Sequence, residues 1–502
     1  MSVLAEAGVI DGKAVVGNRT VTADVCIIGS GASGAPVAAE LAAAGLRVVV
    51  LEDGPYVRTD ELTSDPRTEL GRLYRDGGQT MTTGNTPVIV PVGRAVGGTT
   101  LVNSGTCLRT PDAVFGEWVR TLGLDDLAPG ALAPFYEQAE SESGVGAVTP
   151  ELAGGNARRI EAAATSLGWS SHYLTRNARG CVGSGVCAFG CPAGAKQHTA
   201  ITYLARAHDR GATTFCHARA STVRIEGGVV RGVHATTAGG GTLRVDAPRV
   251  VVAAGTFHTP GLLAASGIRN RWLGKNLSIH PATAAWGVVD EEIEMGIGVP
   301  QSLAIDEFAA EGLMLEGISG PPAYLALSVP YSGDAHRELM LRYRHVAQFG
   351  LMIRDRSRGS VPTGRLARRA GTVIRYDVGR EDTELIFTGL ERLVELLFAA
   401  GARRVLTPVN GVPELTDGDL RPLRAVPRRP QRLKLMAFHP LGTARMAARP
   451  EDGVCDSNGA VHGVSGFYVA DGAAVPSALG VNPQLTIMAL AIRLGQHLVK
   501  GA

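Results

Sequence analysis

The sequence predicts an α/β protein in which a domain built on a parallel sheet is interrupted by a second, inserted domain. Three glycine-punctuated stretches, at 23–52, 213–265 and 467–500, indicate short apolar strands followed by helices. Between them the pattern changes, and Arg-rich stretches and one strongly apolar helix at about 383–401 appear. We therefore expect a discontinuous first domain and an inserted second one, with the boundaries 20–273 plus 435–502 and 274–434.

The first stretch has the order strand, turn, helix, strand. VCII at 25–28 is a short apolar run suited to a buried parallel strand, and GSGASG at 29–34 supplies the turn. The small residues APVAAELAAAG at 35–45 indicate a helix. LRVVVLE at 46–52 then indicates a second strand, which ends in an acid.

Glycine spacing in this turn predicts a dinucleotide site. Gly29, Gly31 and Gly34 give G-x-G-x-x-G, which is a weak signal alone in a chain with 65 glycines. Here the motif follows a strand and begins a helix, and an acid, Glu52, ends the next strand 18 residues past Gly34. The glycines allow a tight turn, close approach to a pyrophosphate and close packing of helix on strand. The fingerprint does not distinguish FAD from NAD.

Composition excludes several other classes of protein. The formal net charge is +2, and no basic stripe indicates nucleic acid. The N-terminal residues show no signal peptide, and no window has 18 uninterrupted apolar residues, so we expect no transmembrane segment. Four of the seven cysteines stand alone, which favours a reducing compartment, and the cytoplasm is the expected location.

Further segments resemble the glucose–methanol–choline (GMC) oxidoreductase family. GRAVGGTTLVN at 93–103 is similar to its first signature, and GTFHTPGLLAASGI at 255–268 is similar to its second, with Arg269 in place of a glycine. HPLGTARM at 439–446 and DSNGAVHGVSGFYVADGAAVPSALGVNPQLTIMALA at 456–491 resemble the catalytic end. The resemblance implies a Rossmann-like FAD-binding domain and an inserted α+β substrate domain, with an antiparallel sheet and helices.

The same resemblance implies FAD as the cofactor and a set of residues around it. Some family members attach FAD covalently through a histidine at the position of Val102, so we predict non-covalent FAD. The residues expected to contact FAD are Gly29, Gly31, Ser33, Gly34, Glu52, Asp53, Gly93, Arg94, Gly97, Gly98, Thr99, Asn103, Val223, Ala254, Gly255, Asp471, Gly472, Asn482, Pro483 and Thr486.

His439 and Asn482 are the expected catalytic pair. Removing hydride from an alcohol requires a base for the hydroxyl proton, and the ordinary pKa of imidazole lies close to neutral pH. Asn482 does not titrate, but its amide can donate to the developing alkoxide oxygen. The expected reaction is oxidation of an alcohol, with O2 or another carrier as electron acceptor. A relative that performs no redox chemistry, such as a hydroxynitrile lyase, is the alternative.

The cysteine-rich segment GCVGSGVCAFGCPAGAKQ at 180–197 leaves two interpretations open. Cys181, Cys187 and Cys191 are spaced as in an iron–sulfur loop of one GMC branch, but Gly180 stands where that branch has a further cysteine. The segment also resembles the long-chain alcohol oxidase branch, in which no cluster is implied. We favour a loop that covers the flavin site, and we expect no metal. A lipophilic alcohol is slightly preferred over a sugar or polyol.

Overall fold

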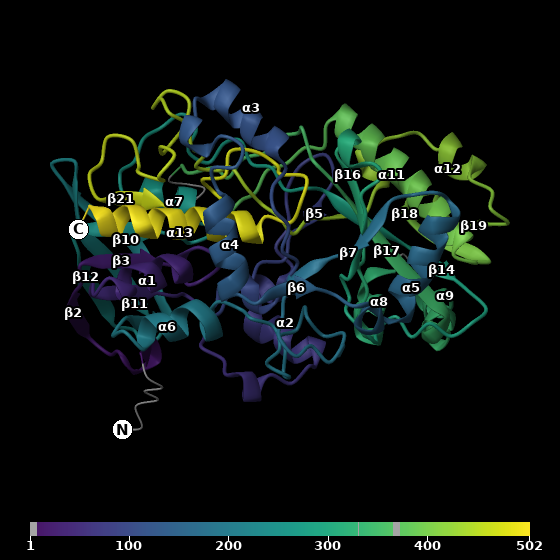
Figure 1. The fold of residues 1–502 in the computed structure, drawn as a ribbon, viewed down its shortest axis with the longest axis horizontal. Coiled ribbons are helices and arrows are strands. Elements are labelled where there is room, and N and C mark those ends of the chain that lie inside the picture. Colours follow the sequence, from purple (N-terminus) through teal and green to yellow (C-terminus); the bar gives the residue numbers. More distant parts are fainter. Residues whose placement is uncertain (1–7, 330, 365–371, 502) are drawn as a thin grey trace.

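The computed structural model describes residues 8–329, 331–364 and 372–501. Residues 330 and 365–371 of the predicted second domain lie outside the described residues. Figure 1 shows two lobes: elements from both ends of the chain share one lobe, and the green middle of the chain builds most of the other. Among the described residues, no helix has the length and apolarity that a membrane crossing requires.

The first lobe contains a six-stranded sheet in which every neighbouring pair is parallel. Its central strands are fully buried apolar runs, as parallel strands between two covered faces require. Both strands predicted on either side of the glycine turn are confirmed as β3 and β4. In sheet order the strands are β1 (Val9–Asp11), β9 (Thr213–Cys216), β4 (Val48–Leu51), β3 (Val25–Ile28), β13 (Arg249–Val252) and β21 (Phe467–Val469).

Two helices from opposite ends of the chain pack together in this lobe. α1 (Gly34–Ala43) consists mostly of small residues, and it contacts the long C-terminal helix α13 (Gln484–Lys500). A four-stranded sheet, in which β11 contacts β13, completes the lobe. Its strands, in sheet order, are β10 (Ala218–Glu226), β11 (Val229–Thr237), β12 (Thr242–Asp246) and β2 (Asn18–Thr22).

The second lobe is built on a nine-stranded sheet that is mainly antiparallel. β5 and β7 join it from before residue 274, and β20 joins it from just after residue 434. The predicted second domain therefore supplies six of the nine strands. The strands are β19 (Val412–Thr416), β18 (Arg404–Val409), β14 (Ala282–Val288), β17 (Val346–Ile353), β16 (Leu313–Glu316), β15 (Leu303–Ile305), β7 (Ser171–Tyr173), β20 (Leu435–Met436) and β5 (Val88–Ile89).

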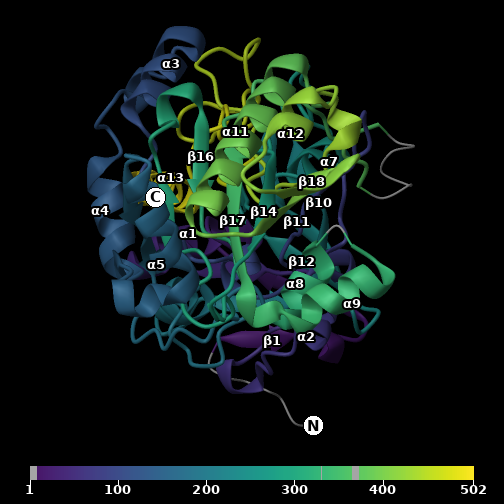
Figure 2. The ribbon, with the colours of Figure 1, turned by 90° about the vertical axis from the view of Figure 1, so that its right-hand side faces the viewer.

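One face of this sheet is covered by α11 (Arg380–Ala399), the apolar helix predicted at 383–401. Figure 2 shows α11 across β14, β17 and β18, and these elements are in contact. Leu390 and Leu397 of the helix share a buried core with Phe349 of the sheet, so the apolar face of the helix belongs to the core. The opposite face of the sheet lines the cavity described below.

Shorter elements connect the two lobes and cover their edges. A two-stranded antiparallel sheet joins β6 (Val145–Ala147) to β8 (Thr175–Asn177). In the described part of the chain the remaining α-helices are α2 (Pro66–Leu73), α3 (Asp112–Leu122), α4 (Ala133–Glu142), α5 (Pro150–Ser166), α6 (Ala205–His208), α7 (Thr259–Ala265), α8 (Pro322–Ser328), α9 (Gly333–Leu341) and α12 (Arg421–Ala425).

The packing of α1 on β3 generates a first prediction. A Cβ at Gly34 would fall on the carbonyl oxygen of Gly29 and lie 3.2 Å from Cβ of Ala253. Gly34→Ala should therefore lower the free energy of unfolding by about 1–3 kcal/mol, measured as a drop in Tm. Gly71→Ala is the matched control, because Gly71 lies exposed in α2 with no atom within 4 Å of its added Cβ. Equal Tm values for the two variants would contradict this packing argument.

Candidate active site

One cavity of about 1260 Å³ lies between the parallel sheet and the nine-stranded sheet. Its lining extends from the glycine turn after β3 to His439 and Asn482. Ligand pockets usually have volumes of about 300–1,000 Å³. The cavity is therefore large enough for a dinucleotide together with a small second molecule.

The glycine turn lies at one end of this cavity. Gly29 has φ +104°, a left-handed conformation, and a Cβ there would strike the backbone of Ala253. Gly31 lines the cavity, and an added Cβ would meet nothing closer than Gly98 Cα at 3.7 Å. Ser33, the residue before α1, also lines the cavity. The N-terminus of α1 and an unobstructed backbone at Gly31 fit a pyrophosphate group.

The two acids after β4 are held differently. Glu52 is buried, and its carboxylate accepts hydrogen bonds from Ser30 Oγ at 2.6 Å and from the Gly54 amide at 2.8 Å. Burial raises the pKa of Glu52. Burial also acts to raise the pKa of Asp53, but the hydrogen bond from Arg75 and the charge of Arg94 bring it below its ordinary value. Both acids line the cavity, as the fingerprint predicts.

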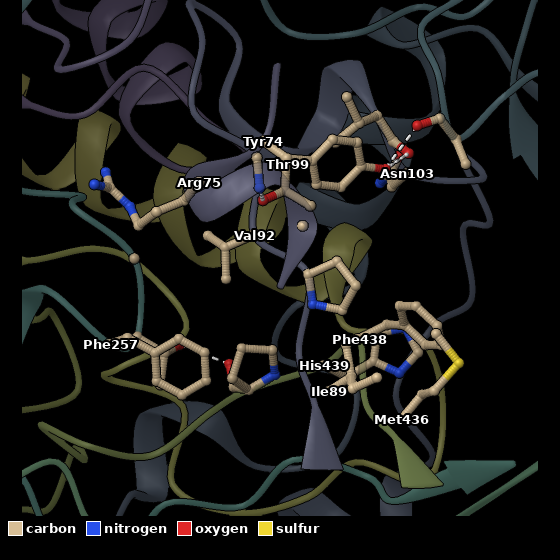
Figure 3. Close-up of a pocket in the computed structure, with 18 of the residues that line it drawn as sticks. Tyr74, Arg75, Ile89, Val92, Thr99, Asn103, Phe257, Met436, Phe438 and His439 are labelled. Carbon is tan, nitrogen blue, oxygen red and sulfur yellow. Dashed lines mark hydrogen bonds between the residues drawn. The ribbon is translucent and has the colours of Figure 1, made fainter. Parts of the chain in front are cut away.

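A second glycine turn, from the segment 93–103, meets the first. Gly97 and Gly98 both have positive φ, and a Cβ on Gly98 would lie 2.8 Å from Gly31 Cα. The Gly97 amide donates to Ser30 Oγ at 3.1 Å, which ties the two turns together. Gly93, Arg94, Gly98, Thr99 and Asn103 line the cavity, and Figure 3 shows Thr99 and Asn103 on the same side of it. Gly97 lies behind this wall.

The ends of β13 and β21 bring a third group of predicted residues together. The carboxylate of Asp471 accepts hydrogen bonds from the Gly255 amide at 2.8 Å and from Thr259 Oγ1 at 2.6 Å. Burial raises the pKa of Asp471. Ala254 and Gly472 line the cavity beside these two residues. Asp471 therefore fixes the loop after β13, in addition to facing the cavity.

His439 and Asn482 meet at the other end of the cavity. Asn482 Nδ2 lies 3.2 Å from His439 Nε2, so the amide donates to this nitrogen when it carries no proton. Figure 3 shows His439 beside Ile89, Met436 and Phe438, an apolar surrounding. Burial and the neighbouring His280 lower the pKa of His439 to about 3, whereas the sequence had suggested an ordinary imidazole value. The imidazole is therefore neutral at physiological pH.

His280 links the two segments that carry this pair. Its Nε2 accepts hydrogen bonds from the backbone amides of Leu479 at 2.9 Å and Gly480 at 3.1 Å. That nitrogen is therefore unprotonated, so Nδ1 carries the proton and donates to the His439 carbonyl at 3.2 Å. The backbone amide of His280 donates to Asp355 Oδ1 at 3.1 Å.

Four predicted residues do not line the cavity, and Gly97, described above, is one of them. The amide of Val223, which we expected to face adenine, donates to Ser266 Oγ at 2.8 Å. Thr486 is fully buried, and its hydroxyl lies 2.7 Å from Thr110 Oγ1 and 2.8 Å from the Tyr136 hydroxyl. Gly34 packs inside α1. Pro483, by contrast, lines the cavity as the residue before α13.

Sequence reasoning missed several residues of the cavity wall, including four on the nine-stranded sheet or beside it: Trp286, Gln301, Glu316 and Gln348. Glu316 ends the apolar strand β16 and is 8% exposed. Burial raises its pKa to about 7, although the amides of Asn482 and Gln301 act in the opposite direction. A single acid within an otherwise apolar strand, in LMLEG, was the available signal.

The three cysteines of the segment 180–197 line a second, small cavity, but their sulfur atoms do not all lie within 4.8 Å of one another. Cys181, Cys187 and Cys191 line it with Arg176 and Lys196. Arg176 Nη2 lies 3.2 Å from Cys187 Sγ, and burial lowers the pKa of Lys196 to about 8. The free volume is about 10 Å³, which is roughly that of one water. In this conformation the loop has no room for a cluster.

Comparison with known proteins identifies the family. The chain matches GMC oxidoreductase at residues 70–282 (N-terminal) and 355–491 (C-terminal), and an FAD binding domain at 24–64. It is 41% identical to an uncharacterized GMC-type oxidoreductase of Mycobacterium tuberculosis, over 95% of this chain and 76% of the relative. It is 28% identical to a long-chain-alcohol oxidase of Arabidopsis thaliana, over 95% of this chain and 67% of that protein.

The fold agrees with this result. The structure resembles that of pyridoxine 4-oxidase from Mesorbium loti with a TM-score of 0.73 at 19% identity, covering 94% of this chain and 98% of that one. The resemblance drawn from the sequence motifs is confirmed, as is the expected mixed α/β fold. The chain belongs to the GMC oxidoreductase family and carries that family's FAD-binding domain.

Proposed function

We propose that this protein oxidises the CH–OH group of an alcohol to a carbonyl group. The observation that carries the proposal is the His439–Asn482 pair, 3.2 Å apart, in the same cavity as the dinucleotide turn. An alcohol oxygen placed between these two side chains would donate its proton to His439 Nε2 and accept a hydrogen bond from Asn482 Nδ2. Two groups that hold one oxygen also fix the direction of the carbon attached to it.

His439 can accept this proton because its Nε2 is unprotonated in the cavity, while the same burial makes it a weaker base than an ordinary imidazole. Its backbone carbonyl is held by His280, so the ring projects from a fixed segment. Asn482 does not titrate, and it stabilises negative charge on the alcohol oxygen at any pH. These side chains bind, orient and deprotonate the alcohol.

FAD, when bound, supplies the acceptor for the hydride. The residues that would hold it are those of the two glycine turns, with Glu52 and Asp53 at the nucleoside end and Asn103 and Pro483 nearer to His439. Gly31 fits this role because no atom lies closer than 3.7 Å to its missing Cβ. Val102 stands at the position of covalent attachment in some relatives, which supports non-covalent FAD.

The substrate side of the proposal rests on the surroundings of His439. Ile89, Met436 and Phe438 give it an apolar wall. Together with the likeness to a long-chain-alcohol oxidase, this wall supports an alcohol whose reacting carbon carries an aliphatic portion. The electron acceptor is O2 or another carrier.

A second candidate rests on the three thiols at the small cavity. An iron–sulfur cluster on Cys181, Cys187 and Cys191 would make the protein a dehydrogenase that passes electrons to a partner. The thiols lie close to two cationic side chains, but the free volume is about 10 Å³, so the loop would have to open. We expect no iron above background in metal analysis of the purified protein. Stoichiometric iron with acid-labile sulfide would establish the second candidate instead.

Anaerobic mixing of the yellow protein with an alcohol tests the redox function directly. We expect the flavin absorbance to bleach, because the electrons have no acceptor other than FAD. A lyase of the same family would leave the absorbance unchanged, since it transfers no electrons. Persistence of the yellow colour with a broad panel of alcohols would therefore refute the oxidation.

His439→Ala should lower the rate of this bleaching by about a hundredfold or more, because the hydroxyl proton then has no acceptor. The FAD content, measured from the absorbance of the purified protein, should stay at the level of the unmodified chain. His172→Ala is the control, because His172 is exposed on β7, the edge strand of the nine-stranded sheet. Bleaching by His439→Ala at the rate of the control would show that the imidazole is not the base.

A further inference from the structure

The cavity face of the nine-stranded sheet carries polar side chains in register. Because side chains alternate along a strand, Ala284, Gly350 and Glu316 lie side by side on β14, β17 and β16. Trp286 and Gln348 are paired in an adjacent row on the same face. All five residues line the cavity. Beside Glu316, Gly350 carries no side chain, and a Cβ added there would lie 2.8 Å from Ile318 Cγ2.

Four buried polar atoms at this end of the cavity have no partner among the described residues. Three are acceptors, namely Glu316 Oε2, Gln348 Oε1 and Asn482 Oδ1, and one is a donor, Trp286 Nε1. Their side chains belong to residues that are 8%, 1%, 5% and 3% exposed, respectively. A buried polar atom without a partner is destabilising, so such atoms are normally paired. Four of them around one cavity indicate a ligand that completes their hydrogen bonds.

Two of these atoms, those of Asn482 and Glu316, lie next to the reacting position, and Gln348 and Trp286 lie one row further along the sheet. Asn482 approaches Glu316 closely enough to influence its carboxyl group, and the Asn482 amide nitrogen lies 3.2 Å from His439 Nε2. The apolar residues Met436 and Phe438 lie beside His439, so the reacting end has an apolar wall and a polar wall. A simple alkanol would contact the first wall and leave the second without partners.

We propose that the alcohol oxidised here carries a second hydrogen-bond donor, a hydroxyl or an amino group, which binds Glu316 and Gln348. This inference rests on the proposed alcohol oxidation and narrows its substrate class. Three free acceptors against one free donor favour a ligand rich in donors, and Trp286 Nε1 can donate to the oxygen of a second hydroxyl. The slight preference for a purely lipophilic alcohol is thereby replaced by an alcohol with one apolar and one polar portion.

The electrostatic state of Glu316 agrees with this assignment. Burial raises its pKa to about 7, so both the protonated and the ionised form of the carboxyl group are accessible near neutral pH. A protonated amine bound beside it would stabilise the carboxylate, while a hydroxyl can donate to either form. A hydroxyl group and an amino group on the substrate are therefore both compatible with Glu316, and the experiment below distinguishes them.

The test compares 1-alkanols of two to six carbons with diols and amino alcohols of the same lengths. Rates of anaerobic flavin reduction are measured as a function of alcohol concentration for the FAD-loaded protein. We expect the best diol or amino alcohol to exceed the matching alkanol at least about tenfold in kcat/KM, mainly through KM. Equal values for all three classes at every length would overturn the inference while leaving alcohol oxidation in place.

Two substitutions assign the effect to Glu316. In Glu316→Leu, the kcat/KM for a diol or amino alcohol should come close to that for the matching 1-alkanol. Glu316→Gln keeps an acceptor but loses the charge, so it should retain a preference for diols and lose one for amino alcohols. The control is Glu311→Gln, an exposed position five residues earlier, which should preserve the profile of the unmodified protein. An unchanged profile in Glu316→Leu would remove Glu316 from substrate recognition.

Binding is measured separately from chemistry in FAD-loaded His439→Ala. The same diols and amino alcohols are titrated while the flavin absorbance spectrum is followed. We expect the preferred compound to bind at least about tenfold more tightly than its alkanol, and Glu316→Leu added to this variant to abolish the difference. Selective binding without flavin reduction in the unmodified protein would refute the oxidation but not the polar subsite. If neither selective binding nor flavin reduction were observed, both the polar subsite and the oxidation would be refuted.

Discussion

The arrangement of the active site depends on the hydrogen bonds of one buried imidazole, that of His280. His439 and Asn482 lie 43 residues apart on loops that have no regular structure of their own. The ring of His280 donates to the backbone of His439 and accepts from the amides of Leu479 and Gly480, just before Asn482. Because both ring nitrogens are used, rotation or protonation of this ring would break contacts to one of the two loops.

A second constraint, the absence of side chains where two turns meet, acts at the nucleotide end. Gly31 and Gly98 come from different segments and approach closely, because a Cβ on Gly98 would lie 2.8 Å from Gly31 Cα. Ser30 joins the two turns further, since its hydroxyl donates to Glu52 and accepts from the Gly97 amide. The site is therefore assembled by backbone contacts between loops whose positions the parallel strands determine.

Local patterns were sufficient to predict the parts of the fold that depend on neighbouring residues. VCII, the glycine turn and LRVVVLE contain their own strand, turn and helix signals, and His439 lies in a segment whose motif is continuous. Glu316 could not be found in this way, because its environment comes from cross-strand pairing with Gly350 and from Asn482 in the other lobe. The same reason applies to β5 and β7, which join a sheet far from them in sequence. The low pKa of His439 likewise depends on burial that only the folded chain provides.

Desolvation shifts the pKa values of two titratable groups at the substrate end, His439 and Glu316, in opposite directions. It lowers the pKa of His439 to about 3 and raises that of Glu316 to about 7, so both groups tend toward their neutral forms. Transfer of a proton from an alcohol to His439 creates a cation in this apolar setting. Glu316 is a buried acid that the Asn482 amide also approaches, and an ionised Glu316 would favour that cation by Coulomb attraction in a region of low dielectric constant. The same carboxyl group can therefore bind a polar part of the substrate and stabilise the charge that the reaction places on the base.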